Sequence, residues 1–178
     1  MHLLTAVVLY LTIRELFRTP ALAGRYPAGT ETFVALAGAA VWAVNPVQTQ
    51  AVTYIVQRMA VMAALFYLAG LWAYLQARLS AGRRRAGYFL LTGVMALAAV
   101  LSKENAILLP LSLLVLEIIF FVTPDREKAL FRPFWRRPAF ILAIILAGAV
   151  LAGMTVFVGG NPLFFLHGYD WRPFTLTE

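Results

Sequence analysis

The chain has 178 residues, of which 62% are hydrophobic and only 13% are charged. Soluble domains are about 45–50% apolar with glycine counted and about 25% charged, and a globule of this length has too little interior for the excess. These proportions argue against a soluble enzyme and a disordered chain. The lack of cysteine excludes a disulfide scaffold and thiolate metal binding. An all-α, polytopic transmembrane protein is predicted instead.

Six apolar segments follow one another along the chain. A helix needs about 20 residues, with a range of about 17–25, to cross the hydrocarbon core of a bilayer. No internal repeat or separate soluble domain interrupts the segments, so residues 1–178 are expected to form a single transmembrane module of about six spans. The segments are Met1–Phe17, Thr32–Asn45, Met59–Ala77, Ala86–Leu101, Ala106–Val122 and Pro138–Val158.

Basic residues are concentrated in every second connection between these segments. The net charge of +7 therefore fits membrane orientation better than a nucleic-acid-binding face. The positive-inside rule places these connections in the cytoplasm and the N-terminus of this chain outside. The basic residues are Arg14, Arg18 and Arg25, then Arg78, Arg83, Arg84 and Arg85, and finally Arg126, Lys128, Arg132, Arg136 and Arg137.

The first connection on the outer face is Asn45–Arg58. Pro46 is expected to end the second segment, because proline lacks an N–H and restricts the residue before it. A short helix starting near Gln50 would carry Gln50 and Gln57 on one polar face. Arg58 lies where the third segment enters the membrane. It either extends its charge to the head groups or binds a lipid-linked phosphate.

The second outer connection is the short stretch Ser102–Asn105. Lys103 and Glu104 would each cost roughly 2.5–3.5 kcal/mol at a helix centre, so they are expected at the interface or in a polar cavity. The stretch is either a solvated hairpin tip or a phosphate-binding site in which Glu104 orients Lys103. Glu117, inside the fifth segment, is interpreted as an interfacial or helix-pairing residue rather than a catalyst.

The third outer connection contains the aromatic-rich motif Asn161–Pro173. Its aromatic residues are either ordinary interfacial residues or part of a loop that packs over a sugar or lipid head group. Asp170 is the one aspartate on the outer side and the local candidate for a catalytic carboxylate. One histidine, His167, and one aspartate do not make a metal site, so no metal or cofactor is predicted.

Three stretches carry a resemblance to a known family. They are N-P-V-Q-T-Q-A-V-T-Y-I-V-Q-R (Asn45–Arg58), M-A-V-M-A-A-L-F-Y-L (Met59–Leu68) and L-S-K-E-N-A-I-L-L-P (Leu101–Pro110). They resemble bacterial membrane proteins that carry a multispan glycosyltransferase-like module before tetratricopeptide repeats, and the related animal transmembrane-and-TPR O-mannosyltransferases of the GT-C type. The resemblance implies a multipass protein of the bacterial inner membrane. It also implies sugar transfer on the outer face, from a polyprenyl-phosphate donor to a protein or glycan acceptor.

The resemblance also implies roles for individual residues. It carries over a donor-phosphate or structural role to Arg58, Lys103, Glu104 and Asn105, which match the pattern of the family. Arg58 and Lys103 are predicted to bind the donor phosphate, with supporting roles for Glu104, Asn105, Gln57, Asn45 and Gln50. Relatives usually have His in place of Asn45 and Glu in place of Gln50, which weakens a metal or proton-transfer role for this loop. Their catalytic acid lies in a loop expected before Met1. The chain is therefore expected to be truncated at both ends, and its catalytic base is not identified.

Two other classes of function stay open at this point. The chain is alternatively a non-catalytic membrane module that binds a lipid or a partner subunit. A small transporter ranks last, because Glu117 is the one ionisable residue placed inside a span. The partners expected of the enzyme are a lipid-linked sugar donor, membrane lipids and a protein or glycan acceptor, with no nucleic acid.

Overall fold

The computed structural model describes residues 1–46 and 58–121, together with Ile144 and Gly148. This part of the chain is helical and contains no strand, which confirms the predicted all-α class. The elements are α1 (His2–Leu16), α2 (Thr30–Val44), α4 (Arg58–Leu79), α5 (Gly82–Ser102), the 3-10 helix η2 (Glu104–Leu108) and α6 (Leu109–Phe121).

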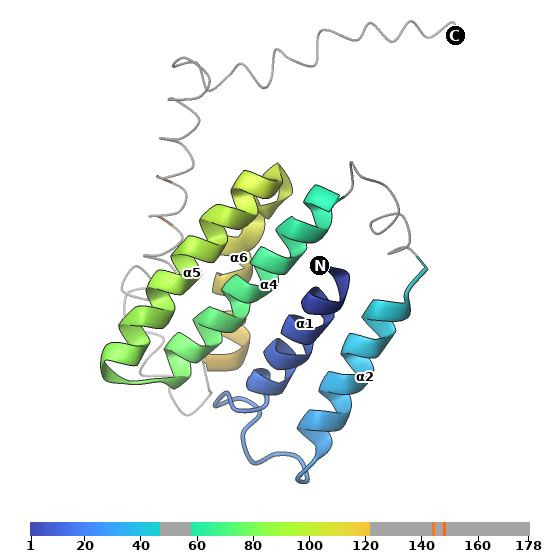
Figure 1. The fold of residues 1–178 in the computed structure, drawn as a ribbon. Coiled ribbons are helices and arrows are strands. Elements are labelled where there is room, and N and C mark those ends of the chain that lie inside the picture. Colours follow the sequence, from blue (N-terminus) through green and yellow to red (C-terminus); the bar gives the residue numbers. More distant parts are fainter. Residues whose placement is uncertain (47–57, 122–143, 145–147, 149–178) are drawn as a thin grey trace, which may run out of the picture.

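The helices lie side by side and run in alternating directions (Figure 1). Helix α4 occupies the middle, where it contacts α1, α5 and α6. The bundle therefore has two distinct ends. Helices α1, α4 and α6 finish at one of them, which we call the arginine end because the predicted basic connections between described helices lie there. Helices α2 and α5 finish at the opposite end, which we call the lysine end after Lys103.

Five of the six predicted segments correspond to described helices. The fourth segment was predicted to begin at Ala86, whereas α5 begins at Gly82 and has 21 residues. Arginine is a good helix former, so Arg83–Arg85 extend the helix beyond the apolar boundary. The fifth segment is divided into η2 and α6. The sixth lies outside the described residues, except for Ile144 and Gly148, which are helical.

Two of the described helices, α4 and α5, are long and apolar enough to cross a membrane. Helices α1 and α2 have 15 residues each. At about 1.5 Å per residue they reach about 22 Å, which is less than the roughly 30 Å of a bilayer core. The described part of the chain thus contains two helices, α4 and α5, that are long enough to span a membrane. The total of about six spans stays a prediction.

The main core forms where α4, α5 and α6 meet. The connection between α4 and α5 is only two residues long, and Gly82 has a φ of 60°. Glycine adopts this left-handed conformation readily, so the chain can reverse sharply and bring the two long helices together. The buried residues of this core are Tyr74, Leu75, Ala96, Leu109, Leu113, Leu116 and Phe121.

Candidate functional site

The Ser102–Asn105 stretch forms a sharp break between α5 and η2 at the lysine end. Ser102 Oγ donates a hydrogen bond to the carbonyl of Ala98 at 2.7 Å, and the Lys103 N–H donates to the carbonyl of Ala99 at 3.0 Å. Lys103 itself has extended backbone, with φ −162° and ψ 136°. Its side chain is exposed. The local hydrogen bonds therefore end α5 and leave the lysine on the surface.

Arg58 lies at the same end of the bundle as Lys103. It is the first residue of α4 and is exposed, as is Asn105 in η2. Because α4 and α5 are antiparallel neighbours, the start of α4 and the end of α5 lie together (Figure 1). The structure therefore brings the two predicted phosphate-binding cations to one end of one helix pair. Their binding role stays a prediction.

The predicted supporting residues are only partly described. Asn45 caps the C-terminus of α2, where its N–H donates to the Trp42 carbonyl at 3.4 Å and its backbone is extended. Helix α2 thus ends just before Pro46, as predicted. Gln50, Gln57 and Asp170 lie outside the described residues, and so does the side chain of Glu104. The predicted support of Lys103 by Glu104 therefore lies outside the described side chains as well.

His2 is a feature of the lysine end that the sequence reasoning missed. Its Nε2 donates to the Ala43 carbonyl at 3.0 Å, and its ring stacks on Trp42 with centroids 4.8 Å apart. These contacts join the start of α1 to the end of α2. The sequence could have indicated this contact, because two antiparallel helices of similar length place the first turn of one beside the last turn of the other. Among the described residues, no group of three metal-ligating side chains converges.

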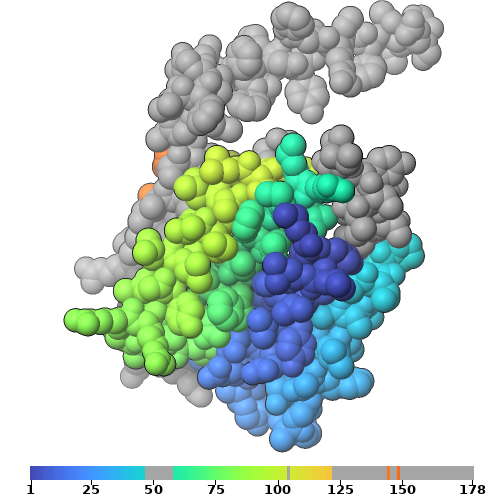
Figure 2. Space-filling model, in the orientation of Figure 1, coloured from blue at the N-terminus to red at the C-terminus, as the bar shows by residue number. Residues whose placement is uncertain are grey.

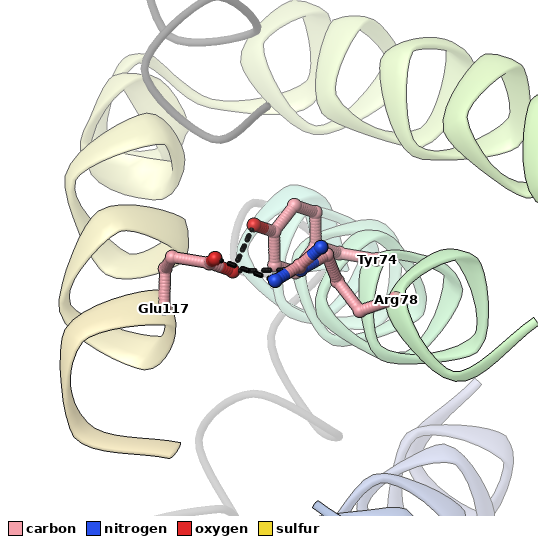
Figure 3. Close-up of polar contacts among 3 residues, drawn as sticks. All are labelled: Tyr74, Arg78 and Glu117. Atoms are coloured by element: carbon pink, nitrogen blue, oxygen red, sulfur yellow. Dashed lines mark hydrogen bonds and ion pairs between the residues drawn. The ribbon is translucent and has the colours of Figure 1, made fainter. Parts of the chain in front are cut away.

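A buried ion pair joins α4 to α6 near the arginine end. Arg78 donates from Nε and Nη2 to the two carboxylate oxygens of Glu117, at 2.9 and 2.8 Å, and Tyr74 Oη donates to Glu117 Oε2 at 2.6 Å (Figure 3). The Glu117 side chain is only 5% exposed. The Arg78 guanidinium also lies 4.8 Å from the ring centroid of Phe121. Of the two roles predicted for Glu117, interfacial or helix-pairing, the structure shows the helix-pairing one.

The partners of Glu117 were not identified from the sequence. By sequence, Arg78 belongs to a basic connection, and the pattern predicts no role for Tyr74. The available signal was their spacing, because residues four apart share a helix face, and a lone acid in an apolar helix requires partners. A second pair, Arg18 and Glu15, is 2.9 Å apart near the end of α1. Two of the arginines near this end are thus neutralised within the protein.

Comparison with known proteins leaves the family unassigned. No family model matches the chain, and searches of curated proteins and of solved structures find no match either. The resemblance to glycosyltransferases therefore rests on its motifs, and the structure contributes the placement of their cations.

Proposed function

We propose that this chain is part of a membrane glycosyltransferase, in which Arg58 and Lys103 hold the phosphate of a polyprenyl-phosphate sugar donor. The observation that carries this proposal is the exposure of both motif cations at one end of the α4–α5 pair. Sugar transfer leaves negative charge on the departing phosphate, and fixed cations stabilise that charge. An arginine offers two parallel hydrogen bonds to a phosphate, and a lysine offers a compact charge.

A multipass arrangement of about six spans in the bacterial inner membrane is part of this proposal. Its support is the outward-facing apolar surface. In the most apolar windows of α4 and α5, only 33% and 17% of the residues are buried. Phe33, Leu90 and Leu101 are 73%, 72% and 74% exposed. Exposure to water costs about 25 cal/mol for each Å² of apolar surface, whereas lipid removes that penalty.

The proposed orientation of the bundle rests on its charges. By the positive-inside rule the arginine end faces the cytoplasm and the lysine end faces outward. Arg58 and Lys103 would then meet the donor on the outer face, with its prenyl chain between helices. This is the face on which the resemblance implies catalysis.

Cysteine labelling tests this orientation, because the natural sequence has no cysteine. Asn105→Cys at the lysine end and Ala81→Cys at the arginine end both replace exposed residues. We expect a membrane-impermeant maleimide to label Asn105→Cys in intact cells. Ala81→Cys should react only after the membrane is permeabilised. The reverse pattern would contradict the proposed orientation, and labelling of both in intact cells would contradict a membrane barrier between the two ends.

Donor binding tests the phosphate site itself. In the full-length protein, we expect Arg58→Ala and Lys103→Ala each to weaken binding of the polyprenyl-phosphate sugar by at least about tenfold, because hydrogen bonds to charged groups contribute about 1.5–3 kcal/mol. The matched control is Arg25→Ala, which removes an exposed cation from the α1–α2 connection at the arginine end. Unchanged affinity and turnover in both site variants would show that the phosphate role is wrong.

A non-catalytic binding module is the second candidate, and one observation favours it. The carboxylates whose side chains are described are Glu15, Glu31 and Glu117, and all lie toward the arginine end of the bundle. Apart from Glu104, whose side chain is not described, no acidic residue of the described helices lies at the lysine end with Arg58 and Lys103. Binding of the donor that depends on these cations, without sugar transfer by the full-length protein, is the result expected of this alternative.

A further inference from the structure

The first turn of α5 carries three consecutive exposed arginines, Arg83–Arg85. Near the same end, Arg18 is neutralised by Glu15 and Arg78 by Glu117. Arg83 and Arg84 have no acidic partner among the described residues. Figure 2 shows this turn projecting from the body of the molecule (lime green, lower left). Among the described residues, positive charge without an acidic partner is therefore concentrated at the start of one long helix.

Arg83 shares its helix face with an exposed apolar stripe. Leu90, Val94, Leu97 and Leu101 follow it by about two, three, four and five helical turns, so all five side chains leave α5 in nearly the same direction. The apolar members of this set are 72%, 50%, 48% and 74% exposed. The outward face of α5 is thus a cation followed by a continuous apolar surface.

Arg85 belongs to a different face of the same turn. Its guanidinium lies 5.6 Å from the ring centroid of Phe89. The Phe89 ring in turn contacts the ring of Tyr74, at 6.0 Å between centroids, and packs against the α4–α6 core. Arg85 is therefore directed along the protein. Arg83 and Arg85 carry the same charge, but Arg85 lies against the protein whereas Arg83 lies on the outward face. Substituting each of them therefore tests whether the position of the charge matters.

The start of α5 adds further positive potential. Ala81 precedes the helix and provides no side-chain cap, and the first turn contains no acidic residue. The first amide groups of a helix have no intrahelical partner and carry the positive end of its dipole. Together with Arg83 and Arg84, these amides favour an anion at this position.

We propose that this face of α5 binds an anionic phospholipid of the cytoplasmic leaflet. Arg83 and Arg84 hold its phosphate, and the nearer part of the stripe, Leu90 and Val94, lies about 10 and 16 Å further along the helix and contacts an acyl chain. One leaflet of a bilayer core is roughly 15 Å thick, so an acyl chain whose phosphate lies at Arg83 reaches about as far as Val94. A soluble anion has no acyl chain and would not contact these apolar side chains. The inference rests on the proposed membrane placement of α5 and not on sugar transfer.

The test compares three single substitutions in the intact chain. Phosphatidylglycerol binding to the detergent-solubilised protein is titrated by native mass spectrometry, with phosphatidylcholine as the neutral probe. One arginine near an anionic lipid surface contributes about 1 kcal/mol, so we expect Arg83→Gln to weaken phosphatidylglycerol binding about fivefold, and Arg84→Gln to weaken it to a similar extent. Arg85→Gln removes the same charge from the same turn, and we expect less than a twofold effect.

Three outcomes would overturn the proposal. Equal losses in all three glutamine variants would show a diffuse electrostatic attraction rather than a site. Equal affinity of the natural chain for phosphatidylcholine would show that the phosphate charge is not selected. Displacement of phosphatidylglycerol by glycerol phosphate at comparable concentration would show that the apolar stripe contributes nothing. Lys103→Ala should leave phosphatidylglycerol binding unchanged, so failure of the donor site and failure of this site are distinguishable.

Discussion

Glu117→Leu is expected to lower the free energy of unfolding by about 3 kcal/mol, because it leaves a partly buried arginine without its counter-ion. Arg78 loses both hydrogen bonds to the carboxylate, and the hydroxyl of the fully buried Tyr74 loses its acceptor. The Arg78 side chain is 21% exposed and can turn partly toward the interface, so the low end of the usual 3–5 kcal/mol range applies. Denaturant unfolding of the chain in micelles, followed by circular dichroism, measures the change.

A double substitution separates the charge from the packing at this position. Arg78→Leu combined with Glu117→Leu removes both charges, and buried ion pairs replaced by apolar residues are often neutral in stability. We therefore expect the double variant to recover most of the loss seen in Glu117→Leu. A double variant as unstable as the sum of the two single ones would show that the residues do not act as a pair.

The ion pair connects the two helices on which the proposed donor site depends. Arg58 begins α4, and Lys103 precedes η2 and α6. Near the other end of the same helices, Arg78 and Glu117 join α4 to α6. The buried pair thus fixes the two helices relative to each other, while their lysine ends carry the exposed cations. Stability at one end and spacing of the cations at the other are expected to be linked.

The helix ends that could be predicted from the sequence are those marked by a proline or by a polar break in an apolar run. The end of α2 and the end of α5 followed from Pro46 and from the polar Ser102–Asn105 stretch, because both features are local in the sequence. The start of α5 did not follow, since Arg83–Arg85 end the apolar run without ending the helix. A hydropathy boundary reports where the lipid contact ends, and a helix can continue beyond it.

The buried contacts were harder to predict because they depend on which helices are neighbours. Glu117 was recognisable as a residue in need of partners, yet nothing local in the sequence assigns those partners to α4. Tyr74 and Arg78 become its partners only once α4 and α6 lie side by side. The same holds for His2 and Trp42, whose rings meet because α1 and α2 form an antiparallel pair. The common end of Arg58 and Lys103 was predictable, because successive spans must alternate in direction.

Gly70→Leu is the second substitution with a large expected effect, a loss of about 3 kcal/mol in the free energy of unfolding. Gly70 is buried in α4, and a Cβ at this position would lie 3.2 Å from Leu109 Cδ1 and 3.6 Å from Met95 Cβ. A leucine must therefore push α6 or α5 away from α4. That movement would also strain the hydrogen bond between Tyr67 and Ser112, which joins α4 to α6.

The size of the added side chain, rather than the loss of glycine, should decide this result. Gly70→Ala is expected to be nearly neutral, because the end of the Leu109 side chain can shift slightly and alanine gains about 1 kcal/mol of helix propensity over glycine. Gly87→Leu is the matched control, since a Cβ there has no neighbour within 4 Å. It should be at least as stable as the natural chain in the same micelle assay, because leucine also exceeds glycine in helix propensity. Equal losses in Gly70→Leu and Gly87→Leu would mean that crowding between α4, α5 and α6 is not what Gly70 relieves. A large loss in Gly70→Leu alone would identify this glycine as the point where α4 approaches α5 and α6 closely. The same helices carry the ion pair of Arg78 with Glu117 at one end and the exposed Arg58 and Lys103 at the other.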